Sequence, residues 1–101
     1  MNVLVAISIA PFGIGDELSK EVSQVISLIE DSGLNYRLGS MFTELEGEWD
    51  EVMDLVKSCT MILAERGIRT ELVLKADVRP SYKNMLNEKV TKVQNLLGKK
   101  C

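Results

Sequence analysis

The sequence contains no histidine and few aromatic residues, with one tryptophan, two tyrosines and two phenylalanines among 101 residues. Histidine is the commonest general base and the commonest metal ligand, so its absence argues against catalysis and against a metal site. A nucleic-acid surface combines basic patches with stacking aromatics, whereas this chain carries a net charge of −3. We therefore expect a protein that is not an enzyme, uses no cofactor or metal ion and binds no nucleic acid.

Cysteines and long apolar runs are also scarce. Cys59 falls in a helical pattern and Cys101 follows a polar segment, a spacing that predicts neither a disulfide nor a paired-thiol redox site. The apolar run at residues 3–10 is followed by Pro11. It is too short to span a membrane, and it lacks the flanking residues of a signal peptide. These features are typical of a cytoplasmic protein with no membrane partner.

The composition that remains is that of one globular domain covering residues 1–101, with 46% hydrophobic and 27% charged residues. Residues 3–10 form a continuous apolar run rich in β-branched side chains, which predicts a largely buried strand. Its odd-numbered side chains would share one face, and its smaller even-numbered side chains the other.

Three segments have the three- and four-residue apolar spacing of amphipathic helices. The first segment follows the predicted first strand, the second begins near Asp50, and the third lies within residues 86–97. Gly33 and Gly67 are placed to end the first two helices in a left-handed conformation. Residues 68–79 alternate between apolar and polar side chains over their second half, which predicts a half-buried strand.

The segment between the first two helices is less regular. Residues 35–45 are predicted to form a strand with an irregularity at Gly39 and Ser40, where the alternation becomes unclear. Gly47 predicts a turn, and the second strand of the resulting hairpin would be very short, at residues 46–49.

This order of elements predicts an α+β fold of the ferredoxin-like type, a split βαβ sandwich with the pattern βαββαβ and a further C-terminal helix. We expect an antiparallel four-stranded sheet with helices on one face. The other face would then have no cover within the chain, and an apolar sheet face is commonly buried by another copy of itself. A homo-oligomer with sheets face to face is the prediction, and a monomer with a hydrated antiparallel face is the alternative.

The most acidic stretch is TELEGEWD at residues 43–50. Alternation in a strand would place its glutamates on one side, where carboxylates could bind a divalent cation or act as an acid and base pair. The favoured interpretation is a solvated turn at residues 46–48, followed by Asp50 as the N-cap of the next helix. Packing of Trp49 against the first turns of that helix is favoured over ligand stacking.

Polar side chains on the uncovered sheet face offer a candidate ligand site. Polar groups that converge in a partly apolar, oligomer-covered site are the usual construction of a small-molecule pocket, and a methionine supplies an adaptable apolar wall. The alternative is an interfacial set of salt bridges among the same charged residues. The candidates are Ser8, Met41, Thr43, Lys75, Asp77 and Arg79.

Four segments together carry a family pattern: SIAPFGIGDELSKEV, YRLGSMFTELEGEWDEVM, VKSC and LKADVR. They resemble the thiamine-binding protein family of small ferredoxin-like proteins over nearly the whole chain, and the block at residues 43–53 is the most specific part. The family's second strand often contains a proline and a glycine at the positions that Ser40 and Phe42 occupy here.

The resemblance implies a homotetramer, a dimer of dimers with packed sheets, that binds thiamine or its hydroxymethylpyrimidine part without catalysis. It places Ser8, Thr43, Lys75 and Asp77 at the family's polar strand positions. A carboxylate or hydroxyl suits an aminopyrimidine, and a lysine suits a phosphorylated ligand. Storage, delivery or sensing of thiamine would be the role. The alternative is a regulatory or scaffold module that binds a protein partner or another small effector.

Overall fold

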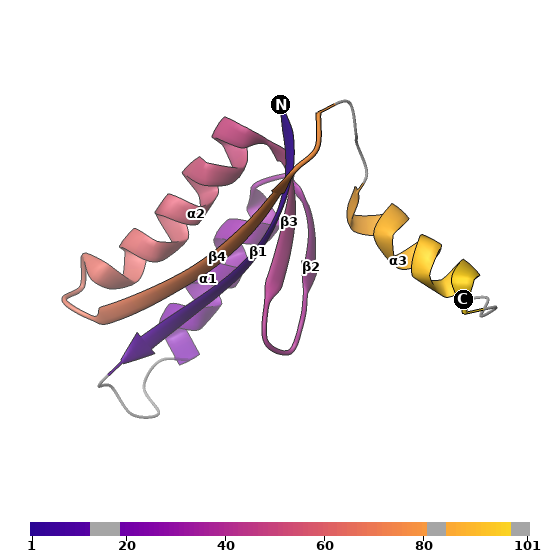
Figure 1. Ribbon diagram of the computed structural model, residues 1–101. Helices are drawn as coiled ribbons and strands as arrows, with labels where there is room; N and C mark the ends of the chain where they lie inside the picture. Colours follow the sequence, from indigo (N-terminus) through magenta and orange to yellow (C-terminus); the bar gives the residue numbers. More distant parts are fainter. Residues whose placement is uncertain (13–18, 81–84, 98–101) are drawn as a thin grey trace.

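A computed structural model describes residues 1–12, 19–80 and 85–97, and within them it confirms the α+β fold. The elements are β1 (Asn2–Phe12), α1 (Ser19–Asp31), β2 (Asn35–Leu38), β3 (Thr43–Glu48), α2 (Trp49–Ala64), β4 (Arg69–Val78) and α3 (Met85–Leu96). The strands form one antiparallel sheet in the order β2-β3-β1-β4, with long, twisted β1 and β4 side by side (Figure 1). This order fits a ferredoxin-like sandwich.

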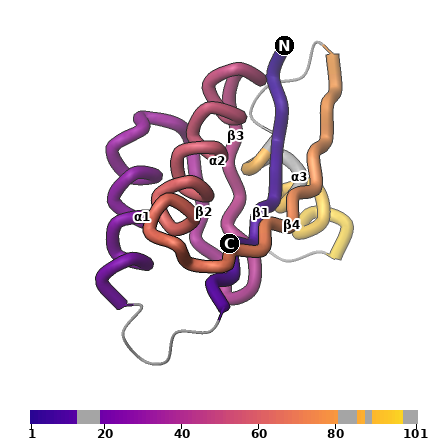
Figure 2. Tube along the Cα trace, turned by 90° about the vertical axis from the view of Figure 1, so that its left-hand side faces the viewer, coloured from indigo at the N-terminus to yellow at the C-terminus, as the bar shows by residue number. Residues whose placement is uncertain are grey.

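β1 lies inside the sheet and supplies the centre of the core. It pairs with β3 on one side and with β4 on the other. Val3, Val5 and Ile7 are buried because alternate side chains of a strand project to the same face. That face is covered by α1 and α2 (Figure 2). The buried residues that pack with them are Ile29, Leu45, Val52, Leu55, Val56 and Cys59.

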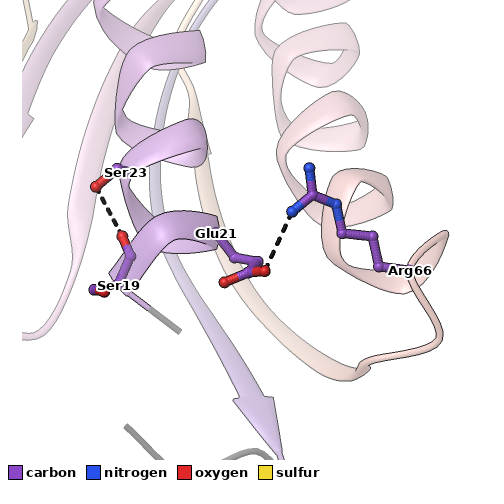
Figure 3. Close-up of polar contacts among 4 residues, drawn as sticks. All are labelled: Ser19, Glu21, Ser23 and Arg66. Carbon is purple, nitrogen blue, oxygen red and sulfur yellow. Dashed lines mark hydrogen bonds and ion pairs between the residues drawn. The ribbon is translucent and has the colours of Figure 1, made fainter. Parts of the chain in front are cut away.

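α1 and α2 also contact each other near one end of the sandwich. Arg66 Nη1, just after α2, lies 3.2 Å from Glu21 Oε1 in the first turn of α1 (Figure 3). The Ser23 hydroxyl in the same part of α1 donates a hydrogen bond of 2.7 Å to the carbonyl oxygen of Ser19. Exposed ion pairs add at most about 1 kcal/mol, so the apolar core provides most of the attachment between these helices and the sheet.

The ends of α1 and α2 follow the predicted signals, whereas the start of α2 does not. Gly33 (φ 76°) and Gly67 (φ 77°) come after α1 and α2 in the left-handed conformation, as predicted. α2 begins at Trp49, and its N-cap is Glu48, which makes no side-chain capping hydrogen bond. The prediction of Asp50 as the N-cap is therefore wrong. Asp50 lies in the first turn of α2 instead, where the helix dipole favours a carboxylate.

The hairpin turn lies earlier in the chain than the predicted one. β2 and β3 are joined by residues 39–42, where the amide of Gly39 donates a hydrogen bond of 3.0 Å to the carbonyl oxygen of Phe42. The apparent irregularity in the predicted strand is thus the turn itself. Residues 46–48 belong to β3, so the prediction of a solvated turn there is wrong.

Gly47 lies within β3, close to packed side chains, and not in a turn. A Cβ atom at this position would lie 2.9 Å from Cδ2 of Leu34 and 3.4 Å from Cγ2 of Val52. These two side chains pack over the strand, so a larger residue at position 47 would require the end of the Leu34 side chain to move. A glycine in the sequence is compatible with a turn or with close packing, and the structure shows close packing here.

α3 lies on the opposite side of the sheet from α1 and α2 in both views (Figure 1, Figure 2). The two helices of the βαββαβ unit cover one face as predicted, but the prediction that the other face has no cover within the chain is wrong, because α3 lies there (Figure 1). Leu86 in the first turn of α3 is buried, whereas Val93 and Leu96 are more than half exposed. The helix is thus attached to the sheet mainly at its N-terminal end. None of the helices described is long and apolar enough to cross a membrane.

We expect Gly39→Ala to destabilise the protein by about 1–3 kcal/mol, because an added Cβ would overlap the carbonyl oxygen of Phe42. Ser40→Ala in the same turn is the control and should change the free energy of unfolding by less than about 0.5 kcal/mol. Urea denaturation followed by circular dichroism measures both values. If Gly39→Ala is as stable as the wild type, the turn is not at this position.

Candidate functional site

Two rows of side chains cross the sheet face that is turned toward α3. Directly paired residues of antiparallel strands project to the same face, and the register therefore defines each row. The first row consists of Arg37, Glu44, Ala6 and Lys75. The second row consists of Asn35, Glu46, Leu4 and Asp77. Polar residues of β3 and β4 thus share one face, with apolar side chains of β1 between them.

A cavity of about 470 Å³ lies between these rows and α3, and we call it the α3 cavity. It has the size, the mainly apolar walls and the few polar groups that are typical of small-molecule sites. The sheet contributes Leu4, Ala6, Glu44, Lys75 and Asp77, and the helix contributes Leu86, Val90, Val93 and Gln94.

Among the described residues that line the α3 cavity, negative charge exceeds positive charge. Glu44 and Asp77 each bring a carboxylate, and Lys75 brings an ammonium group. Glu44 and Lys75 are separated by β1, so their backbones lie about 10 Å apart, whereas Lys75 and Asp77 are about 7 Å apart along β4. An excess of carboxylates in a partly apolar hollow attracts cations and hydrogen-bond donors.

A second cavity of about 350 Å³ lies beside the turn between β2 and β3, and we call it the hairpin cavity. Most of its lining residues are apolar, and its polar lining residues are Ser8, Ser40 and Thr43. The side chain of Ser8 itself projects to the face turned toward α3, because Ser8 is the register partner of Val73. Met41 also lines it and is 78% exposed. None of the described residues that line it is charged, so this cavity suits a neutral, mainly apolar group.

The structure divides the predicted site residues between the two cavities. Lys75 and Asp77 line the α3 cavity, as expected for neighbours on one face of β4. Ser8, Met41 and Thr43 line the hairpin cavity instead. The predicted residues therefore do not form one site within a single chain.

Thr43 accounts for most of this difference. It is the register partner of Ile7, which is a core residue, so Thr43 projects to the face covered by α1 and α2. The prediction that Thr43 shares the uncovered face with Asp77 is wrong. Arg79 lies one residue beyond β4 and lines neither of these two cavities.

The residues missed by the sequence reasoning are Glu44 and the α3 residues. Alternation in the acidic stretch already places Glu44 and Glu46 on one side of a strand, and this signal would have found Glu44 if the segment had been treated as a strand. Nothing in the sequence spacing shows that α3 crosses to this face. Within the described residues, no group of three or more aspartates, glutamates or cysteines could hold a metal ion.

Cys59 is a core residue and not a reactive group. It is free and buried in α2, and burial raises the pKa of its thiol to about 11. The thiolate is the nucleophilic form of cysteine, so a thiol with this pKa is inert near neutral pH. Cys101 lies outside the described residues.

Fold and cavities together define a class of protein: a small ferredoxin-like α+β sandwich with hollows beside its sheet that are large enough for a small molecule. Within that class, the chain belongs to the thiamine-binding protein family, whose family model matches residues 5–94. The family suggested by the four sequence segments is thereby confirmed.

The similar proteins span almost the same length as this chain. UPF0045 proteins of Mycobacterium bovis and Mycobacterium tuberculosis are each 38% identical over 98 residues, which is 96% of this chain and 96% of theirs. A solved domain of unknown function from Bacillus cereus has a TM-score of 0.79 and 30% identity, covering 90% of this chain and 88% of that one. A candidate thiamine biosynthesis/salvage protein from Thermotoga maritima has a TM-score of 0.75 and 29% identity, covering 92% and 99%.

The raised pKa of Cys59 predicts a pH dependence of stability. The ordinary pKa is 9.0 and the folded value about 11, so the contribution of the thiol is complete below pH 9 and is lost as the pH rises through 11. In a Cys101→Ser background, we expect the free energy of unfolding to fall across this window by on the order of 2 kcal/mol more with Cys59 than with Cys59→Ala. Urea denaturation at each pH measures it, and parallel pH profiles would contradict the assignment.

Proposed function

We propose that the protein is a non-enzymatic binder of thiamine or of its hydroxymethylpyrimidine part, and that the ligand occupies the α3 cavity. The observation that carries this proposal is the gathering of Glu44, Lys75 and Asp77 in a hollow of ligand size, in a chain of the thiamine-binding protein family. The likeness to the thiamine biosynthesis/salvage candidate from Thermotoga maritima supports a role tied to thiamine, in its storage, delivery or sensing.

The polar groups of the cavity fit the pyrimidine half of thiamine. An aminopyrimidine donates hydrogen bonds from its exocyclic amine and accepts them at its ring nitrogens. Asp77 offers a carboxylate that accepts, and Gln94 offers an amide that both accepts and donates. The apolar side chains of Leu4 and Val90 line the same hollow and would pack against the ring faces. Binding of this kind requires no covalent step.

The charges fit the other half of the ligand. The thiazolium ring is a cation and is stabilised near the carboxylates of Glu44 and Asp77. The ammonium of Lys75 repels that ring, so it would lie near the hydroxyethyl end of thiamine or near a phosphate attached there. Titration with thiamine and with its phosphates compares these two possibilities directly.

The proposal includes a homotetramer, a dimer of dimers joined through sheet faces, in the reducing cytoplasm. Val73 projects from β4 on the face that α3 covers only in part, since its register partner is Ser8. Val73, Val93 and Leu96 are all more than half exposed, and apolar surface of this kind is commonly buried in an interface. The free, unpaired thiol of Cys59 supports a reducing compartment.

We expect isothermal titration calorimetry to detect binding of thiamine or hydroxymethylpyrimidine to the wild type. Asp77→Asn should weaken this binding by about tenfold or more, because it removes a charged hydrogen-bond acceptor from the cavity. Glu71→Gln is the matched control: it neutralises an exposed carboxylate on the same strand and the same face, opposite Ala10, and it should bind as the wild type does.

Three outcomes would contradict the proposal. No binding of thiamine, its phosphates or hydroxymethylpyrimidine at millimolar ligand would refute the function. Equal losses in Asp77→Asn and Glu71→Gln would show that only overall charge matters. A loss in Thr43→Val with none in Asp77→Asn would move the ligand to the hairpin cavity.

Sedimentation analysis tests the proposed assembly. At micromolar concentration we expect the wild type to sediment as a tetramer, and Val73→Glu to shift the distribution to smaller species because it places a charge in the sheet interface. Met61→Glu is the control, since Met61 is comparably exposed on α2, on the far side of the sheet. A wild-type chain that remains a monomer would refute the oligomer.

A further inference from the structure

Glu46 is a buried carboxylate that the proposed ligand chemistry does not use. It lies in the middle of β3 and is only 5% exposed, on the face that is turned toward α3. Burying a carboxylate costs several kcal/mol unless hydrogen bonds replace those it makes with water. The hydrogen bonds that Glu46 makes inside the protein must therefore offset the cost of its burial.

The two oxygens of Glu46 accept hydrogen bonds from different elements. Nδ2 of Asn2 in β1 donates to Oε2 at 2.9 Å, and the backbone amide of Leu86 donates to Oε1 at 3.2 Å. Leu86 is the second residue of α3, where a backbone amide has no carbonyl partner within the helix. A carboxylate at this place also interacts favourably with the helix dipole. Glu46 thus caps α3 from a strand 40 residues away in sequence.

The part of α3 that Glu46 holds is also a wall of the α3 cavity. Leu86 lines the cavity and is 2% exposed. Val90, Val93 and Gln94 continue that wall along the helix. The apolar side chains become more exposed toward the end of α3, so the most deeply buried part of this wall is at Leu86.

We propose that Glu46 is a positioning residue for the ligand site: by holding the first turn of α3 against β3, it sets the distance between the helical wall and the floor of the cavity. This inference rests on the proposed function, because it assigns the α3 cavity to the ligand. A ligand that needs the docked helix loses apparent affinity in proportion to the fraction of molecules in which the helix is docked. Glu46 therefore acts on binding through α3.

The test variant is Glu46→Gln, which keeps the size of the side chain. Glutamine replaces one acceptor oxygen with an NH₂ group that cannot accept a hydrogen bond from Leu86 or Asn2. We expect hydrogen exchange of the Leu86 amide to become about tenfold faster and the affinity for thiamine to fall about tenfold. The amides of Val5 and Leu45 in the core of the sheet should keep their protection.

A distance measurement follows the helix without any ligand. Spin labels at Ser58→Cys and Asn95→Cys report the separation of α2 and α3, because both positions are exposed. Cys101→Ser removes a competing thiol, and buried Cys59 does not react with the label. We expect a narrow distribution of distances in the wild type and a broader one in Glu46→Gln.

Arg37→Gln is the matched control, because Arg37 contacts α3 but is not one of the described residues that line the α3 cavity. Nη2 of Arg37 donates a hydrogen bond of 3.3 Å to Oδ1 of Asn87 in the same turn of α3, but this contact is exposed and water competes for it. Its loss should leave exchange, distances and affinity within about twofold of the wild type. Asn2→Ala is a second variant, which removes the hydrogen bond from Asn2 to Oε2 of Glu46. It should also speed up exchange of the Leu86 amide and weaken binding.

The outcomes separate the two claims. Faster Leu86 exchange, broader distances and weaker binding in Glu46→Gln, with Arg37→Gln unchanged, would support the positioning role. A loosened helix with unchanged thiamine affinity would overturn it, and so would a helix that stays in place in both Glu46→Gln and Asn2→Ala. A wild-type protein that binds neither thiamine nor hydroxymethylpyrimidine would refute the proposed function, whatever the helix measurements show.

Discussion

The pairing of β1 with a strand on each side is the constraint on which the rest of the structure depends. Its hydrogen bonds to β3 and β4 define the register, and the register decides which side chains face which layer. Val3, Val5 and Ile7 face α1 and α2 and form the core, while Leu4 and Ala6 form part of the floor of the α3 cavity. A slip of one residue would exchange these two sets, so the core and the site rest on the same backbone hydrogen bonds.

The α3 cavity combines a wall formed by the paired strands with a wall formed by α3, whose buried contact with the sheet lies in its first turn. The sheet contributes the charged groups. They lie on paired strands, on the face opposite the core. The helix contributes an apolar wall whose position depends on its first turn, where Leu86 is buried and bonded to Glu46. For the proposed binding function, preorganisation of this wall would lower the cost of binding.

Sequence reasoning recovered the elements that depend on local pattern and failed at those that depend on packing. The spacing of apolar residues predicted the helices, and the β-branched run predicted β1. The acidic stretch resembles a turn because of Gly47, although this glycine lies within β3, where Leu34 and Val52 pack close to it. Because the turn lies at residues 39–42, Glu46 belongs to a strand and is buried. It is therefore a residue that can hold α3 in place and not a solvated turn residue.

The sequence by itself therefore determined the fold class, the family and most helix ends, because periodicity, capping glycines and a specific block of residues are local properties of the chain. Only the tertiary structure decided the side of the sheet that α3 covers, the face to which Thr43 projects, and the separation of the predicted site into two cavities. These depend on strand register and on contacts between residues 40 or more positions apart, such as Glu46 with Leu86. No local spacing encodes such contacts, since the free energy that selects them comes from burial and pairing in the complete fold.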